Sequence, residues 1–251
     1  MKKINKLLFC LSAIFILSCL FIFPACEDYS DPNKITENGI SYKKVNLKRD
    51  NITVQAYYVS SCDDTIEILN IPDKINGLSV LGIEDNAFLN HTNLREVTLP
   101  DSITQGYLCW TPFKGCTNIE KLTLAFCDVM LLFTDYGSGE MNKEITVPPS
   151  LKYIYLTEGC QSIKSRTLYY CTNIKELHIP KSVTKIDDGT GLINIGVNGN
   201  PANSSRFNDL PFIGCNNLKI YCEAISKPEG WGHYWNYIDS TTSAPVYWDH
   251  Y

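Results

Sequence analysis

The residue types best suited to chemistry are cysteine and histidine, of which the chain has eleven and four. Cys116, Cys171 and Cys215 occupy one position of a recurring phrase, and His91 occupies that position in a fourth copy. Zinc sites usually draw on Cys-x-x-Cys pairs, and the sequence contains none. A side chain that recurs once per repeat stacks in the interior of a repeat protein, so we expect a ladder of small buried thiols.

Disulfide bonds are the alternative interpretation of the cysteines. Cys109 and Cys116 form one conceivable pair, and Cys62 with a neighbouring cysteine forms another. A parallel stack of repeats does not by itself bring two Cβ atoms to the separation that a disulfide needs.

No catalytic or metal-binding constellation stands out among the remaining polar residues. None of the histidines lies in a metalloprotease signature, and His178 falls at an outward position of a predicted strand. The acidic pairs at 63–64 and 187–188 lack the spaced oxygen ligands of a calcium loop, and the glycines at 189–199 precede no helix pattern. We therefore expect no enzyme activity, no cofactor and no resident metal.

Composition places the chain among ordinary core-forming proteins. Of its 251 residues, 44% are hydrophobic and 20% are charged, which is typical of a folded domain. The 22 basic residues are outnumbered by 27 acidic ones, giving a net charge of −5. Without a basic excess, nucleic acid is not an expected partner.

The first 25 residues have the order of a secretory signal peptide. Three lysines precede an uncharged, mostly apolar run at 7–23, and Ala25 stands directly before Cys26. This junction is similar to a bacterial lipobox, so we expect Cys26 to be acylated and to anchor the protein in the membrane. Cys19 is a rival acylation site, and simple cleavage or an uncleaved anchor are the other outcomes. All of them export the rest of the chain, and residues 26–39 read as a flexible tether.

Internal repeats determine the predicted fold. Residues 88–94, 113–119, 168–174 and 212–218 share the phrase Phe/Leu, two residues, Cys/His, Thr/Asn, Asn, Leu/Ile. Apolar residues spaced three and then two apart follow, and they place strand starts at 66, 94, 119, 151, 174 and 218. The shortest step is 23 residues, the scale of a leucine-rich repeat. Insertions near 133–148 and 187–208 account for longer steps.

These repeats predict a leucine-rich-repeat solenoid of about six coils with a short parallel β-sheet on one face. Val97, Leu122, Ile154 and Leu177 should be equivalent inward positions. The predicted segments are a signal peptide at 1–25, a tether at 26–39, a hairpin cap at 40–60, the solenoid at 61–224 and a C-terminal cap at 225–251.

The C-terminal segment is rich in aromatic residues. We interpret these side chains as a cap over the last coil, with a sugar-stacking platform as the alternative. They are Trp231, Tyr234, Trp235, Tyr237, Tyr247, Trp248 and Tyr251.

The recurring phrase, followed by x-x-Val-x-Leu-Pro-x-Ser-Ile, resembles the BspA-like leucine-rich repeat. Residues 71–88 are similar to the opening repeat of that family, and residues 220–231 are similar to its closing segment. The resemblance covers about residues 40–240. It implies a cell-surface protein, with some members acting in adhesion to host or neighbouring cells, including matrix proteins. The expected partners are therefore extracellular or surface proteins. A carbohydrate-binding or carbohydrate-active surface protein is one alternative, and a structural envelope protein with no diffusible ligand is another.

Strand alternation predicts the side chains that face outward from the sheet. Tyr153 and Tyr155 lie near its middle and are the expected anchors of a bound protein. An idle sheet face, or binding by the two insertions, are the alternatives. The full candidate face comprises Glu96, Thr98, Lys121, Thr123, Tyr153, Tyr155, Glu176 and His178.

Overall fold

The computed structural model describes residues 31–49, 52–103, 111–133, 147–168, 171–187 and 210–250. The chain divides into two units, residues 1–32 and residues 33–251, and the fold described below is that of the second. Cys26, Cys19, Cys109 and most of both insertions lie outside the described residues.

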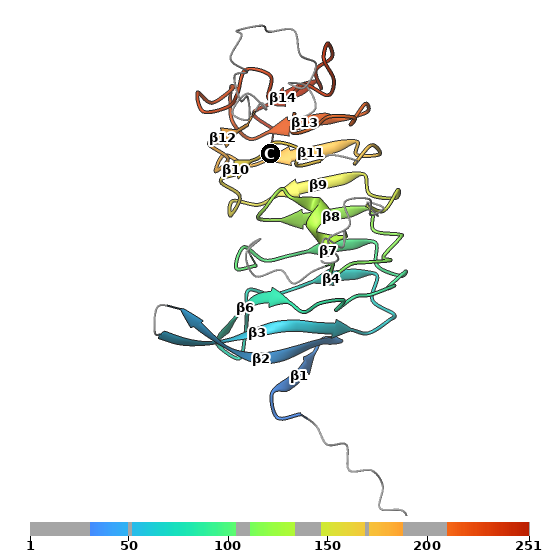
Figure 1. Cartoon of the computed structure of the whole chain (residues 1–251), viewed down its shortest axis with the longest axis vertical. Coiled ribbons are helices and arrows are strands. Elements are labelled where there is room, and N and C mark those ends of the chain that lie inside the picture. The colour runs from blue at the N-terminus through green and yellow to red at the C-terminus, as the bar shows by residue number, and fades with distance from the viewer. Residues whose placement is uncertain are drawn as a thin grey trace, which may run out of the picture. The chain divides into compact units, whose positions relative to one another are not determined.

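The main element is a parallel sheet of seven short strands in the order β14-β13-β11-β9-β8-β7-β4 (Figure 1). All six neighbouring pairs are parallel, and a parallel pair needs a long connection between its strands, so each coil contributes one strand. This confirms the predicted parallel sheet. The strands are β4 (Ile68–Asn70), β7 (Glu96–Thr98), β8 (Lys121–Leu124), β9 (Tyr153–Leu156), β11 (Glu176–Ile179), β13 (Lys219–Cys222) and β14 (Val246–Trp248).

One row of apolar side chains runs through the strands on the inner side of the sheet. The register aligns them directly, and each is no more than 1% exposed, so the predicted inward positions are confirmed. Stacking thus buries the apolar surface that a single coil would leave exposed to water. The row is Leu69, Val97, Leu122, Ile154, Leu177 and Ile220.

The recurring phrase shapes the corner that leads into each strand. Phe88 and Phe113 stack at 4.7 Å between ring centroids. The Asn93 side-chain amide donates a hydrogen bond to the carbonyl of Asp64, and that of Asn118 donates to Thr92. These two recurring asparagines therefore each link their coil to the preceding one.

On the returning side, two shorter strands pair in parallel. They are β10 (Ser162–Ile163) and β12 (Lys185–Ile186). A 3-10 helix, η2 (Val129–Leu132), follows β8 at a coil corner.

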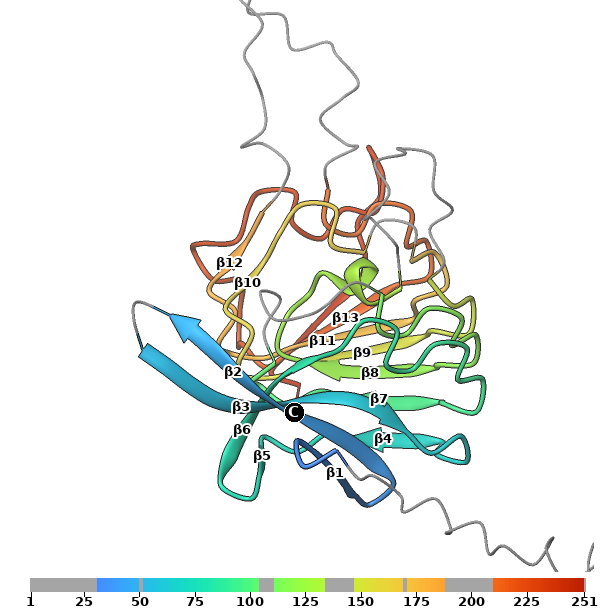
Figure 2. The ribbon, with the colours of Figure 1, turned by 60° about the horizontal axis from the view of Figure 1, so that its bottom comes forward.

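The N-terminal end of this unit is a second sheet in the order β1-β2-β3-β6-β5. Strands β2 and β3 form an antiparallel hairpin that extends sideways beyond the coils in both views (Figures 1 and 2). Strand β3 also pairs in parallel with β6, which connects the hairpin to the first coil. The strands are β1 (Lys34–Glu37), β2 (Ile40–Arg49), β3 (Ile52–Cys62), β5 (Lys74–Ile75) and β6 (Leu78–Ile83).

Strand β1 differs from the sequence prediction of a flexible tether over 26–39. Residues 34–37 pair antiparallel with β2, and the two strands are joined by Asn38 and Gly39 with φ of 52° and 75°. Asn-Gly favours this two-residue hairpin turn because both residues tolerate positive φ. The ordered sheet thus begins at residue 34.

The C-terminal segment, predicted as an aromatic cap, also contributes a strand to the sheet. Strand β14 pairs in parallel with β13 and adds a seventh strand to the sheet. Behind it, Trp231 and Trp235 are buried and pack with Trp248, with centroid distances of 4.5–6.0 Å among the three rings. The described part of the chain has no helix long and apolar enough to cross a membrane.

Candidate binding face

The outer side of the seven-stranded sheet carries two columns of side chains. In β7, β8, β9 and β11 the first and third residues are half-buried and point outward, while the second is buried. All eight residues predicted for the face therefore lie together on it. The first column is Glu96, Lys121, Tyr153, Glu176 and Lys219, and the second is Thr98, Thr123, Tyr155, His178, Tyr221 and Tyr247.

Four rings of the second column stack face to face, and we name them the aromatic ladder: Tyr155, His178, Tyr221 and Tyr247. The centroid distances are 4.1, 4.8 and 4.9 Å, and the interplanar angles are 14–16°. The spacing follows from the sheet, because parallel neighbours in register lie about 4.8 Å apart. Such offset or parallel pairs add about 0.5–1.5 kcal/mol each beyond area burial.

His178 occupies the middle of the ladder with 22% of its side chain exposed. Its Nε2 atom is buried without a hydrogen-bond partner among the described residues, and lies 3.6 Å from a carboxylate oxygen of Glu176. Burial lowers the pKa of His178 and outweighs the opposing effect of Glu176, while His250 at 5.9 Å lowers the pKa further. The fold therefore favours the neutral form of the His178 ring.

The other end of the ladder meets a charged region. Lys121 Nζ lies 5.3 Å from the centroid of the Tyr155 ring and 3.1 Å from Glu96 Oε2. A cation over a tyrosine face is attracted by the ring quadrupole. This lysine therefore covers the ring face of Tyr155 that is not stacked on His178.

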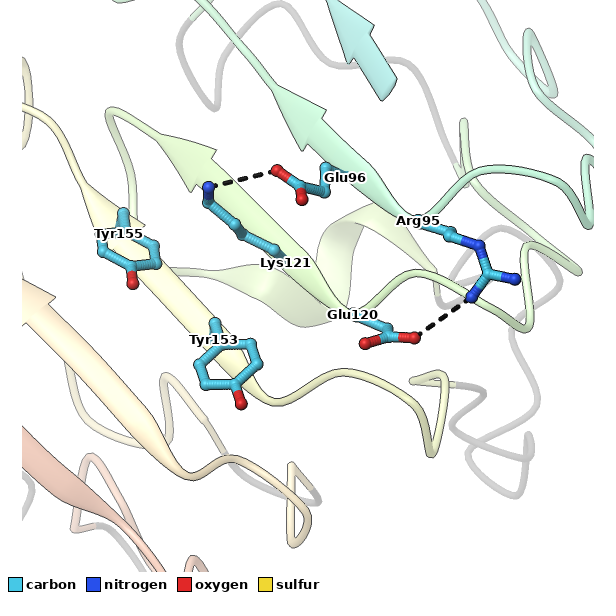
Figure 3. Close-up of a pocket in the computed structure, with 6 residues that line it drawn as sticks. All are labelled: Arg95, Glu96, Glu120, Lys121, Tyr153 and Tyr155. Carbon is cyan, nitrogen blue, oxygen red and sulfur yellow. Dashed lines mark hydrogen bonds and ion pairs between the residues drawn. The ribbon is translucent and has the colours of Figure 1, made fainter. Parts of the chain in front are cut away.

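An open pocket of about 310 Å³ lies between this lysine and the tyrosines of β9 (Figure 3). On its far side, Arg95 Nη1 pairs with Glu120 Oε1 at 3.3 Å. These ion pairs are solvent-exposed, so each contributes little to folding and stays available to a partner. The lining residues are Arg95, Glu96, Glu120, Lys121, Tyr153 and Tyr155.

Sequence reasoning missed five contributors to this face: Arg95, Glu120, Lys219, Tyr221 and Tyr247. Arg95 and Glu120 directly precede their strands, where the corner turns them toward the pocket. Tyr221 and Tyr247 belong to the last two strands, and Tyr247 was assigned to the aromatic cap. Applying the alternation rule to 219–222 would have found Tyr221, whereas residues 246–248 lack the repeat phrase.

The repeated cysteine position is buried, as the ladder of thiols predicts. Cys116 Sγ donates to the carbonyl of Phe88 at 2.9 Å, and Cys215 Sγ lies 3.4 Å from the carbonyl of Cys171. Burial raises the pKa of Cys116 to about 11 and that of Cys215 to about 12. Thiols held protonated in this way are poor nucleophiles and poor metal ligands.

The described cysteines are all free, at positions 62, 116, 127, 160, 171, 215 and 222. Within the same described ranges, no group of three or more His, Cys, Asp or Glu side chains is arranged to hold a metal ion. His91 takes the cysteine position of its coil and bonds through Nε2 to the carbonyl of Asp63 at 2.9 Å. Its role there is to link two coils.

A stack of coils with one short parallel strand each, a buried side-chain ladder and an outward-facing sheet defines a leucine-rich-repeat protein. The model of the "BspA type Leucine rich repeat region" matches the chain in six copies, over residues 35–129 and 147–220. The chain belongs to this family. No curated protein shows a significant match to it.

Several solved structures are similar to the chain at low identity. A leucine-rich repeat protein of Bacteroides capillosus is 18% identical, with a TM-score of 0.33, over 62% of this chain and 88% of its own. One from Bacteroides ovatus is 20% identical, with a TM-score of 0.38, over 74% and 46%. A leucine rich cell surface protein of Faecalibacterium prausnitzii is 17% identical, with a TM-score of 0.32, over 78% and 56%.

Proposed function

We propose that the protein is exported, is tethered to the membrane through Cys26, and binds proteins at the cell surface through the outer face of its sheet. Membership in the BspA-type family supports a general role in protein binding or adhesion. The secretory pattern of residues 1–25 supports export.

The observation that carries the proposal is the composition of the outer face. Aromatic side chains form its centre, and Arg95, Glu120 and Lys121 form a charged rim at one end. Buried or half-buried tyrosines within a polar rim are typical of the energetic centre of a protein interface. Lys121 and the tyrosine hydroxyls add directional hydrogen bonds.

The ladder geometry favours a protein ligand over a carbohydrate. A sugar-binding platform needs an open ring face, but in the ladder the ring faces cover one another at 4.1–4.9 Å. The tryptophans of the C-terminal segment are likewise packed, and Trp231 Nε1 donates to the carbonyl of Val183 at 3.0 Å. These rings therefore present mainly edges and hydroxyls to a ligand.

The ligand experiment begins with a pull-down by the full chain, followed by mass spectrometry and titration of the captured protein. Replacing Tyr153 and Tyr155 together with alanine should cost roughly 2 kcal/mol or more, about a 30-fold rise in Kd. Leu89→Ala, at an exposed residue outside the two columns, is the control. Unchanged affinity in the double variant would move the site to the insertions or the C-terminal segment.

The anchor is tested separately. The wild-type chain should partition into detergent and shift in mass by the acyl groups, and Cys26→Ser should abolish both effects because acylation adds about 0.8 kcal/mol per buried methylene. Cys19→Ser serves as the control at the rival position. A wild-type protein found entirely in the culture medium would refute the lipoprotein part of the proposal.

A further inference from the structure

The described residues nearest the end of the β2–β3 hairpin, 47–48 and 52–54, include apolar side chains that are half-buried or exposed. Leu47 pairs with Val54, and Ile52 lies two residues before Val54, so these three side chains share one face of the hairpin. Ile52 is 65% exposed and Val54 is 44% exposed, both among the most exposed large apolar residues described. The tip therefore offers an apolar patch, which we define as Leu47, Ile52 and Val54.

Charge is segregated along the chain in a way that singles out this hairpin. Residues 33–62 contain five basic residues against two acidic ones, a net of +3. Residues 63–251 contain 14 basic residues against 22 acidic ones, a net of −8. An exposed aliphatic patch within the basic part of an acidic protein matches an anionic lipid surface, where apolar groups enter the acyl boundary and cations meet the headgroups.

The path of the chain brings this patch within reach of a bilayer. Lys34 pairs with Lys43, and the amide of Lys44 donates a hydrogen bond to the carbonyl of Asn33, so residues 33–34 lie beside the middle of β2. Arg49 lies six residue steps along β2 from Lys43, about 20 Å at strand spacing. The seven residue steps from Cys26 to Asn33 can extend at most about 25 Å.

We infer that the β2–β3 hairpin is a second membrane contact, with Leu47, Ile52 and Val54 entering the interface of an anionic bilayer and neighbouring basic residues binding its headgroups. The inference rests on the part of the proposed function that exports the protein and tethers it to the membrane. It does not depend on protein binding by the outer face of the sheet.

The test places a tryptophan at the patch in the full-length exported protein. Ile52→Trp is reconstituted into vesicles of equimolar phosphatidylglycerol and brominated phosphatidylcholine, and the quenching of wild type is subtracted to remove the four native tryptophans. Thr53→Trp, on the opposite face of the same strand, and Ile225→Trp, exposed far from the hairpin, are the controls. All three positions are exposed, so the variants should fold.

The added tryptophan of Ile52→Trp should be quenched about twofold more than that of either control, because the interface depth of such elements is roughly 5–10 Å. The difference should shrink without phosphatidylglycerol or at 1 M salt, where the Debye length falls to about 3 Å. Equal quenching at the three positions would overturn the inference. So would a concentration-dependent blue shift of Ile52→Trp without vesicles, which would show a second copy covering the patch.

Mass spectrometry shows whether the chain is acylated, so the anchor can be tested independently of the hairpin contact. Selective quenching at Ile52 in a chain that carries no acyl group would refute acylation and keep the hairpin contact. An acylated, vesicle-bound chain with equal quenching at all three positions would keep the anchor and refute the hairpin contact.

Discussion

Replacing Leu122 with alanine tests whether the coils depend on one another as the register implies. Leu122 is 1% exposed and aligns directly with Val97 on one side and Ile154 on the other. Leu→Ala at a fully buried position costs about 2–5 kcal/mol, through lost burial and the cavity that remains. For a domain of this size, about 2–4 °C of melting temperature is lost per kcal/mol, so we expect a fall of roughly 5–20 °C.

The assay is thermal unfolding followed by circular dichroism at fixed protein concentration. Thr123→Ala on the same strand is the matched control, because Thr123 points outward and is only half-buried. Its effect should stay within about 0.5 kcal/mol. A loss below about 2 °C for Leu122→Ala, or an equal loss for both variants, would refute the inward register and the dependence of each coil on its neighbours.

The remaining predictions concern the thiols, the ladder histidine and two turns. Cys215, whose pKa is raised to about 12 by burial, should resist iodoacetamide at pH 8 until the protein is unfolded, as mass spectrometry would report; rapid labelling of the native state would contradict it. The pKa of His178 is lowered in the fold, so the unfolded chain binds its proton more readily and stability should fall as the pH drops below about 6.5. His178→Phe should flatten that part of the stability curve, and an unchanged slope would show that other groups govern it. Gly39→Ala should lower the free energy of unfolding in urea more than Gly77→Ala does. Both glycines have positive φ, but only at Gly39 would an added Cβ meet a side chain, that of Asp63 at 2.7 Å. Equal losses of unfolding free energy in the two variants would exclude that clash.

The solenoid could be predicted because its signal repeats. The spacing of Leu94, Val97 and Leu99 recurs in later coils, and the structure confirms the inward position of Val97 in a parallel sheet. A single coil would carry too little pattern for such a prediction. Agreement across several coils makes the alternation reliable.

Strand β14 could not be predicted from its own residues. Val246, Tyr247 and Trp248 follow no Asn-Leu phrase, and their strand conformation depends on pairing with β13. Tertiary context of this kind overrides local propensity. The outward direction of Tyr155 and His178 was predictable, but the continuation of the ladder through Tyr247 required this pairing.

The N-terminal sheet held a local signal that sequence reasoning passed over. Asn38 and Gly39 form a tight turn with positive φ at both residues, and Asn-Gly between extended segments predicts such a hairpin. The acidic, polar residues around it indicated a tether instead. The exposure of Ile52, in contrast, is set by how far the hairpin extends past the coils, which no local pattern encodes.

Each strand from β9 to β14 of the seven-stranded sheet carries one outward ring of the ladder, and this has a consequence for how such a protein evolves. Duplicating one repeat in the gene would lengthen the face by a single strand spacing, about 4.8 Å, and leave the distant coils unchanged. The aromatic ladder would gain or lose one rung in the same step. Repeat duplication therefore changes the length of the face in fixed steps, whereas point mutation changes only the side chains that it presents.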